Sequence, residues 1–315
     1  MNRREFLVAA AATGLTGCKA ANRKTCSGSS RSCAMPCGKA KARILFGACF
    51  PLSEAKRLKA HGYDFIETTA ASAFIPKKSD EDWKKRKEEI LTCGLPLRSC
   101  NGFLPGEFRL TGPNADFAPA LDYAERLLRR ADEVGTKTIV FGSGGARNVP
   151  GDICGPREQQ PDPEKGVEQY AKFCRLLCDR VADLKTVQVV IEPLRPKESN
   201  IINYVWQGMQ IVREVNHPRL QQLADIFHMI CGKEPASSII DAGRHLKHCH
   251  IACKETRQFP GARPDDAEIF KPYFDALKKI GYTGGVSCEC SWPKDGEAKF
   301  EKALDTALAL MKSLA

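Results

Sequence analysis

The sequence of 315 residues lacks three features that would assign it to a class at once. It has no hydrophobic run long enough to cross a bilayer as a mature helix, since the apolar stretch near its start covers only residues 6–15. It has no glycine-rich phosphate loop beyond the GSGG of residues 142–145, which is a weak signal by itself. Its six histidines are few for a multinuclear metal site. What remains is a globular chain in which 43% hydrophobic residues suffice for a core.

Positive charge is also scarce over most of the chain, although the formal net charge is +10. Residues 1–43 hold nine Lys and Arg residues and one acidic residue, so this segment carries +8 and residues 44–315 carry only +2. The basic character therefore belongs to the N-terminal segment. No broad positive surface is expected on the folded part, and the sequence predicts no nucleic-acid partner.

The first 18 residues resemble an export signal. Arg3 and Arg4, followed by an apolar stretch, resemble a twin-arginine signal, and the sequence LTGC ending at Cys18 resembles a lipoprotein signal-peptidase site. We expect export by the twin-arginine route to the periplasm or cell envelope, with a lipid on Cys18 as the only membrane contact. Residues 19–42 are basic and aperiodic, which predicts a disordered tether. Residues 43–315 form the predicted catalytic domain.

From residue 43 onward, a strand-like run followed by a helix-like run occurs eight times. The first kind of run is continuously apolar, as expected for parallel strands covered on both faces. The second kind shows helical spacing of apolar residues, as in Phe117, Leu121, Ala124 and Leu128. Eight alternating units favour an α/β fold with a single (β/α)8 TIM barrel. The predicted strands are 43–50, 64–70, 95–103, 137–144, 187–193, 220–228, 246–253 and 284–292.

Eleven of the fifteen cysteines lie in the predicted barrel. A free cysteine behaves as a small hydrophobic residue, so those within apolar strands or helices are expected to fill the core. This group comprises Cys49, Cys174, Cys178, Cys249 and Cys288.

Four residues at the ends of the last four predicted strands point to chemistry: Glu192, Asp225, His250 and Glu289. A barrel places its catalytic residues at the C-terminal ends of its strands. Three carboxylates and one imidazole suit Mn²⁺, Mg²⁺ or Co²⁺, with Zn²⁺ as a further alternative. Such an ion can polarise a carbonyl group and stabilise an enediolate, while two carboxylates move protons on opposite faces of the substrate. For Glu192, simple pairing with Arg195 is the structural alternative.

Two further histidines lie near these ends. His228 follows Asp225 by three positions, so we expect it on the turn after the strand, reaching over the site. His248 precedes His250 by two positions, so in a regular strand the two side chains point to the same face of the sheet. This predicts a second, deeper contact with the site from His248. Cys288 and Cys290 flank Glu289 and are expected to face away from it, which disfavours cysteine ligation.

These motifs resemble the sugar-phosphate isomerase/epimerase family with a xylose isomerase-like barrel, which includes ketose 3-epimerases, hydroxypyruvate isomerase and inosose dehydratase. The resemblance covers residues 43–312 and is strongest in IEPLRPKESNIIN at 191–203, in D-x-x-H, in HCHIA and in the C-E of the last strand. It implies one divalent ion, Mn²⁺ by preference, bound by the four strand-end residues. Glu192 and Glu289 would also act as acid and base.

The resemblance further implies which residues bind a sugar or polyol substrate. His228, Glu198 and Arg257 would hold hydroxyl groups, and Glu67 would lie near the pocket. Two points bear on how the substrate is recognised. Arg195-Pro196 stands where the family often has Asn-Arg, and Arg263 is an alternative to Arg257 as the arginine that holds hydroxyl groups. A homo-oligomer is left open.

The leading prediction is therefore a metal-dependent ketose isomerase or epimerase that transfers a proton through an enediolate. A dehydratase of a polyol-derived ketone would use the same four ligands. A sugar-binding barrel without turnover is a second alternative. The endonuclease IV branch of the superfamily is disfavoured, because it needs more histidines and the predicted barrel is nearly neutral.

Overall fold

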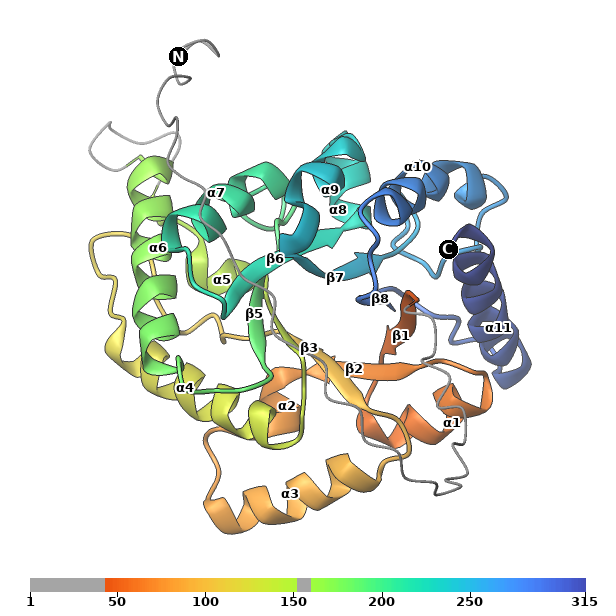
Figure 1. Cartoon of the computed structure of the whole chain (residues 1–315), viewed down its shortest axis with the longest axis horizontal. Helices are drawn as coiled ribbons and strands as arrows, with labels where there is room; N and C mark the ends of the chain where they lie inside the picture. The colour runs from red at the N-terminus through yellow and green to blue at the C-terminus, as the bar shows by residue number, and fades with distance from the viewer. Residues whose placement is uncertain (1–42, 152–159) are drawn as a thin grey trace, which may run out of the picture. The chain divides into compact units, whose positions relative to one another are not determined.

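The computed structural model describes residues 43–151 and 160–315 of the chain. Within these ranges, eight parallel strands form a closed barrel in chain order, and the first strand pairs with the last (Figure 1). The predicted (β/α)8 barrel is therefore confirmed. The expected export signal with Cys18 and the tether at 19–42 lie outside the described residues. The strands are β1 (Leu45–Cys49), β2 (Phe65–Thr69), β3 (Leu97–Asn101), β4 (Thr138–Phe141), β5 (Gln188–Ile191), β6 (Leu220–Asp225), β7 (Leu246–Ile251) and β8 (Gly285–Cys288).

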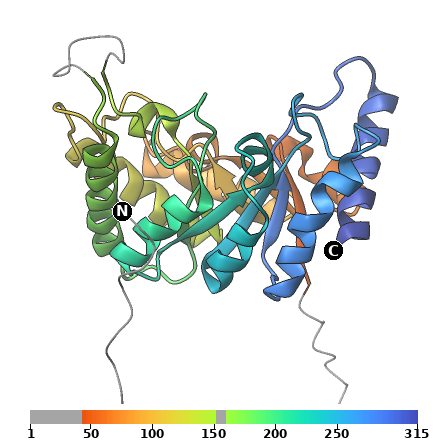
Figure 2. The ribbon, with the colours of Figure 1, turned by 90° about the horizontal axis from the view of Figure 1, so that it is seen from above.

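The helices of the described ranges lie outside the strands and form the outer layer (Figures 1 and 2). None of them is long and apolar enough to cross a membrane. The α-helices are α1 (Ala55–Ala60), α2 (Ala70–Phe74), α3 (Asp80–Thr92), α4 (Ala118–Glu133), α5 (Gly144–Arg147), α6 (Pro163–Arg180), α7 (Val205–Val215), α8 (Ile226–Cys231), α9 (Ser237–Ala242), α10 (Asp266–Lys279) and α11 (Glu297–Leu314).

The apolar core has two parts, as a barrel requires. The larger part lies between the strands and the surrounding helices, and a small cluster of Val140, Val190 and Leu223 comes from the neighbouring strands β4, β5 and β6. The Phe65 ring lies close to two glycines. A Cβ atom would be 2.2 Å from that ring at Gly47 and 2.9 Å from it at Gly285. These two strand positions therefore have to remain small.

The sixth strand is shorter than predicted. β6 ends at Asp225, and helix α8 begins at the next residue, so the predicted strand 220–228 was too long by three residues. The reason is local: the Asp225 carboxylate accepts hydrogen bonds from the backbone N–H groups of Phe227 (2.8 Å) and His228 (3.3 Å). A side chain that satisfies these N–H groups starts a helix. His228 consequently lies within α8.

The cysteines follow the prediction with one exception. Cys174, Cys178, Cys249 and Cys288 are buried in the core, as expected for small apolar side chains. Cys49 is only partly buried, because it is the last residue of β1 and lies at the barrel mouth. The prediction that Cys49 fills the core was therefore wrong.

Asp132 near the end of α4 fixes the entry to β5 and gives a prediction for stability. Its carboxylate accepts hydrogen bonds from the N–H groups of Thr186 (2.6 Å) and Val187 (3.0 Å). Burial by itself raises the pKa of Asp132, but these N–H groups outweigh burial and lower the pKa to about 2. We expect Asp132→Asn to reduce the free energy of unfolding near neutral pH by roughly 1–2 kcal/mol.

The sign of the pH dependence follows from the lowered pKa. The stabilisation by the Asp132 carboxylate is complete above the pKa of an unfolded aspartate, about 3.9, and is lost as the pH falls towards about 2. The difference between wild type and Asp132→Asn in urea unfolding should therefore shrink below about pH 4. Equal stability of the two proteins at neutral pH would contradict this assignment.

Candidate metal centre

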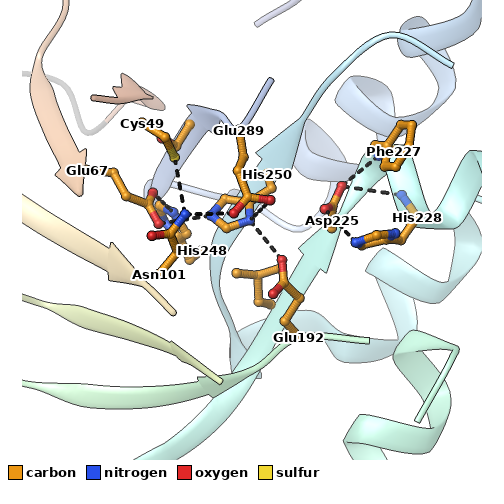
Figure 3. A network of polar contacts seen from close by, with 12 residues as sticks. Cys49, Glu67, Asn101, Glu192, Asp225, Phe227, His228, His248, His250 and Glu289 are labelled. Atoms are coloured by element: carbon orange, nitrogen blue, oxygen red, sulfur yellow. Dashed lines mark hydrogen bonds and ion pairs between the residues drawn. The ribbon is translucent and has the colours of Figure 1, made fainter. Parts of the chain in front are cut away.

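The four predicted ligands converge at the mouth of the barrel. Glu192 follows β5 directly, Asp225 ends β6, His250 lies in β7 and Glu289 follows β8 directly. Asp225 is the register partner of His250 across β6 and β7. One ligand atom from each of the four residues lies within 4.8 Å of the others (Figure 3). The strand ends thus bring together side chains that are up to 97 residues apart in the chain.

The cluster is largely buried, and Glu289 is its most exposed member. The side chains of Glu192, Asp225 and His250 are 7%, 1% and 0% exposed, whereas the Glu289 side chain keeps 21% of its surface exposed. His250 Nδ1 lies 2.9 Å from Glu192 Oε1 and 3.6 Å from Glu289 Oε2. The Nδ1 atom therefore faces the carboxylates and is the ring atom available to an ion.

The other ring nitrogen of His250 is held by Glu67 from β2. His250 Nε2 donates to Glu67 Oε1 (3.0 Å), and His248 Nε2 donates to Glu67 Oε2 (2.8 Å). Burial alone raises the pKa of Glu67, but the charges of His250 and His248 outweigh burial and lower it. An ionised Glu67 accepts the Nε2–H proton and so leaves Nδ1 as the ligand atom. A carboxylate behind a ligating histidine fixes the orientation of its ring in this way.

The surroundings of Glu67 differ from those expected of a substrate-binding residue. Glu67 has no exposed surface, and both of its carboxylate oxygens are bonded to imidazole rings. His248 lies beside His250 with a centroid distance of 5.1 Å, and its Nε2 atom is bonded to Glu67. The contacts of Glu67 are those of a residue that positions His250.

The donor set fits a hard divalent cation. Three carboxylates meet with a single imidazole in a largely buried cluster, and like charges at this separation repel strongly. Burial raises the pKa of Glu289; His250 opposes the rise, whereas Glu192 and Asp225 add to it. A bound cation offsets this repulsion. Three oxygen ligands and one nitrogen ligand match Mn²⁺, Mg²⁺ or Co²⁺.

Glu289 is oriented by two residues from elsewhere in the chain. Asn101 at the end of β3 donates from Nδ2 to Glu289 Oε1 (2.7 Å), and Arg257 donates from Nη2 to Oε2 (2.5 Å). The Asn101 Oδ1 atom has no hydrogen-bond partner among the described residues. Asn101 was missed from the sequence, although its position at a strand end carried the same signal as the four ligands.

Three of the residues predicted to bind substrate, His228, Glu198 and Arg257, lie close to one another near Asp225. His228 Nε2 is 3.4 Å from Asp225 Oδ2 and 3.8 Å from Glu198 Oε2, and it makes no hydrogen bond within the described ranges. Glu198 pairs with Arg195 (2.6 Å) and lies 3.4 Å from Arg257. Arg195 thus pairs with Glu198 and not with Glu192, the alternative considered from the sequence.

The two arginines weighed for the substrate loop lie in different places. Arg257 reaches the cluster and lies over the Phe227 ring at 4.9 Å. Arg263 pairs with Asp265 (3.1 Å) and Glu255 (3.3 Å). Of the two, the structure brings Arg257 to Glu289.

The glycine-rich stretch after β4 lies against Glu192. A Cβ atom at Gly142 would be 2.2 Å from Glu192 Oε2, and one at Gly144 would be 2.4 Å from the Glu198 carbonyl oxygen. Arg147, which is fully buried at the end of α5, donates from Nη1 to the carbonyl oxygens of Glu192 (2.8 Å) and Phe141 (3.2 Å). The loop therefore makes room for Glu192 and holds its backbone. From the sequence, the GSGG of residues 142–145 was considered as a phosphate loop, and the role of Arg147 was not predicted.

A cavity of about 610 Å³ adjoins the cluster on the side of β1 to β3. Its volume lies in the range of small-molecule pockets. Its lining combines apolar and hydroxyl-bearing side chains with Asn101, the residue that contacts Glu289. The lining includes Cys49, Phe50, Thr68, Thr69, Ser72 and Asn101.

The fold and the cluster define a barrel with a candidate metal centre at its C-terminal mouth, and the sequence assigns the family. Residues 55–314 match the family described as xylose isomerase-like TIM barrel, and the chain belongs to this family.

Curated relatives carry a narrower description. The chain is 29% identical over 233 residues to a probable ketose 3-epimerase of Synechocystis sp., covering 73% of this chain and 75% of the relative. It is 29% identical over 237 residues to a ketose 3-epimerase of Arthrobacter globiformis, covering 74% and 75%. The D-psicose 3-epimerase of Clostridium cellulolyticum H10, solved with D-tagatose, has a TM-score of 0.71 at 20% identity and covers 86% of this chain and 99% of that chain. This last likeness shows the fold alone.

Glu67→Gln tests the positioning of His250. A glutamine offers only one acceptor oxygen, so one of the two imidazole rings loses its partner. We expect the affinity for Mn²⁺, measured by calorimetry, to fall about 10–100-fold. Glu234→Gln is the matched control, since Glu234 is also buried but accepts hydrogen bonds from the backbone N–H of Val205. Wild-type affinity in Glu67→Gln would refute the role.

Gly142→Ala tests the room that Glu192 needs. Because the added methyl group would overlap Glu192 Oε2, the carboxylate has to move, and we expect Mn²⁺ affinity to fall by at least about tenfold. Gly106→Ala is the control on the same rim, where a Cβ would meet its nearest atom at 3.6 Å, an ordinary contact. If both variants bind Mn²⁺ like the wild type, the steric argument fails.

Proposed function

We propose that this protein is a divalent-metal-dependent sugar epimerase or isomerase that acts on a ketose by proton transfer through an enediolate. One observation carries the proposal: the carboxylates of Glu192 and Glu289, from two different strand ends, both lie next to His250 Nδ1 within a single four-residue ligand cluster. The ketose 3-epimerase descriptions of its curated relatives support the same reaction type.

Glu192, Asp225, His250 and Glu289 would hold the ion, with Mn²⁺ as the first choice. When bound, the ion would polarise the carbonyl of the sugar and lower the energy of the enediolate. Arg257, which lies at Glu289, would balance part of the negative charge of the three carboxylate ligands. Binding of the ion to His250 also requires that the Nδ1 atom carries no proton.

The proton transfers are assigned to the two glutamates. Arg147 holds the backbone of Glu192, and Gly142 leaves room for its carboxylate. Asn101 holds the carboxylate of Glu289, the most exposed of the four side chains. One carboxylate would remove the proton next to the carbonyl, and the other would return a proton on the opposite face, which inverts that carbon. Burial raises the pKa of Glu289, which favours a carboxyl group able to give a proton back.

Sugar hydroxyl groups would be held above the cluster. His228 Nε2 is buried, makes no hydrogen bond within the described residues and lies 3.8 Å from Glu198 Oε2. Arg257 joins Glu198 to Glu289, so one hydroxyl-binding group is linked to the proposed acid or base. On the cavity side, Asn101 Oδ1 has no hydrogen-bond partner among the described residues and would accept a hydroxyl proton.

The reaction can be tested with isotope exchange. The Mn²⁺-loaded protein is incubated in D₂O with D-fructose, D-psicose, D-tagatose and L-ribulose, and nuclear magnetic resonance follows deuterium at C3 and new epimers. Removal of the metal should abolish exchange, and added Mn²⁺ should restore it. Glu289→Gln should reduce the rate about 10²–10⁴-fold, the usual contribution of a general acid or base.

Two outcomes separate the alternatives. If the metal-loaded wild type exchanges deuterium with none of the sugars, the epimerase proposal fails. If it releases water from a polyol-derived ketone without forming an epimer, the dehydratase is the correct assignment. Mn²⁺ binding by Glu289→Gln is measured in parallel, so that a lost proton transfer is distinguished from a lost metal ion.

A further inference from the structure

Cys49 is a half-buried thiol at the mouth of the barrel, next to two of the four ligands. The Cys49 Sγ atom, a ring nitrogen of His250 and a carboxylate oxygen of Glu289 lie within 4.8 Å of one another. Cys49 lies across this group from Asp225 (Figure 3). The three atoms therefore form a second set of ligands, which overlaps the first set in two residues.

The neighbours of Cys49 keep the thiol beside Glu289. Asn101 Nδ2 lies 2.7 Å from Glu289 Oε1 and 4.0 Å from Cys49 Sγ, so one amide spans both side chains. Ser287 Oγ lies 3.6 Å from Cys49 Sγ on the neighbouring strand. The thiol is thus part of an ordered group of polar side chains and is not a lone cysteine on the surface.

The two ligand sets differ in chemical softness. The set with Glu192 and Asp225 offers three carboxylates and one imidazole, whereas the set with Cys49 offers one sulfur, one nitrogen and one oxygen. Thiolate ligands favour soft ions, and carboxylates favour Mg²⁺ and Mn²⁺. Zinc binds sulfur at about 2.3 Å and nitrogen or oxygen at about 2.0–2.2 Å, so ligand atoms around a tetrahedral ion are roughly 3.3–3.7 Å apart. The three atoms here lie within 4.8 Å of one another, so binding an ion would draw them closer together.

We propose that Cys49, His250 and Glu289 form a second binding site, specific for a thiophilic divalent cation such as Zn²⁺ or Cd²⁺. Occupancy of this site excludes the ion held by the four-ligand cluster, because both sites need His250 and Glu289. Binding replaces the thiol proton by the cation: the S–H bond breaks, a sulfur–metal bond forms, and the proton leaves to the solvent. The softness of the ion then decides which half of the mouth holds it.

This site has a consequence that rests on the proposed function. An ion bound at Cys49 leaves Glu192 and Asp225 without a metal, so the glutamate assigned to proton transfer on that side no longer shares an ion with Glu289. A thiophilic cation would therefore inhibit the enzyme even though it occupies a true metal site.

Cadmium is the probe for the site. The full-length reduced protein is stripped of metal and titrated with Cd²⁺, and the ultraviolet charge-transfer absorption of cadmium–thiolate bonds is recorded. We expect the wild type to gain an absorption increment of one equivalent that Cys49→Ser lacks. Cys93→Ser is the matched control and should keep the full increment, since Cys93 is also half-buried but its thiol contacts the carbonyl oxygen of Leu95.

Competition completes the test. Mn²⁺ should suppress the Cys49-dependent increment in the wild type, because the two sites share ligands, and should leave absorption from other cysteines unchanged. Equal absorption in Cys49→Ser and wild type would overturn the proposal, as would an increment that persists at saturating Mn²⁺. The spectrum does not depend on turnover, so this experiment tests the Cys49 site independently of the proposed epimerase activity.

Discussion

Three carboxylates meet at one end of this barrel with too little positive charge to balance them. Asp225, Glu192 and Glu289 surround His250 at separations where buried like charges repel strongly. A chain gains nothing in stability from such a cluster alone, so its arrangement is best understood as a site prepared for a cation. The remaining features of the mouth follow from the need to hold these side chains in place against their repulsion.

Each member of the cluster is held from outside it. The contact for Glu192 is unusual, because Arg147 is fully buried and no ion pair between Arg147 and an acid is found in the described part of the chain. Its guanidinium instead donates to carbonyl oxygens and to the Ser199 hydroxyl (3.2 Å), which ties the loop after β5 to the loop after β4. Such prior ordering lets binding and catalysis proceed without reorganisation. The four contacts are Arg147 for Glu192, the start of α8 for Asp225, Glu67 for His250 and Asn101 for Glu289.

The site residues placed by strand ends could be predicted from the sequence, whereas those that act through loops could not. Glu192 and Glu289 were found because each ends an apolar run, and parallel strands in a closed barrel bring such ends together. Arg147 and Gly142 act through loop backbone geometry, which hydrophobic periodicity does not encode. For Cys49, the apolar run itself misled the prediction. An apolar strand suggests burial, but the last position of β1 faces the mouth of the barrel. The end of β6 was missed because an aspartate began a helix inside an apolar run.

The central claim is that one cation is shared by four strand-end side chains. Anomalous diffraction from crystals grown with Mn²⁺ tests it most directly. The account predicts one strong peak at the mouth, about 2.1 Å from a carboxylate oxygen of Glu192, Asp225 and Glu289 and from His250 Nδ1. A mouth without a peak at saturating Mn²⁺, or a peak bound by His250 Nε2 after displacement of Glu67, would contradict it.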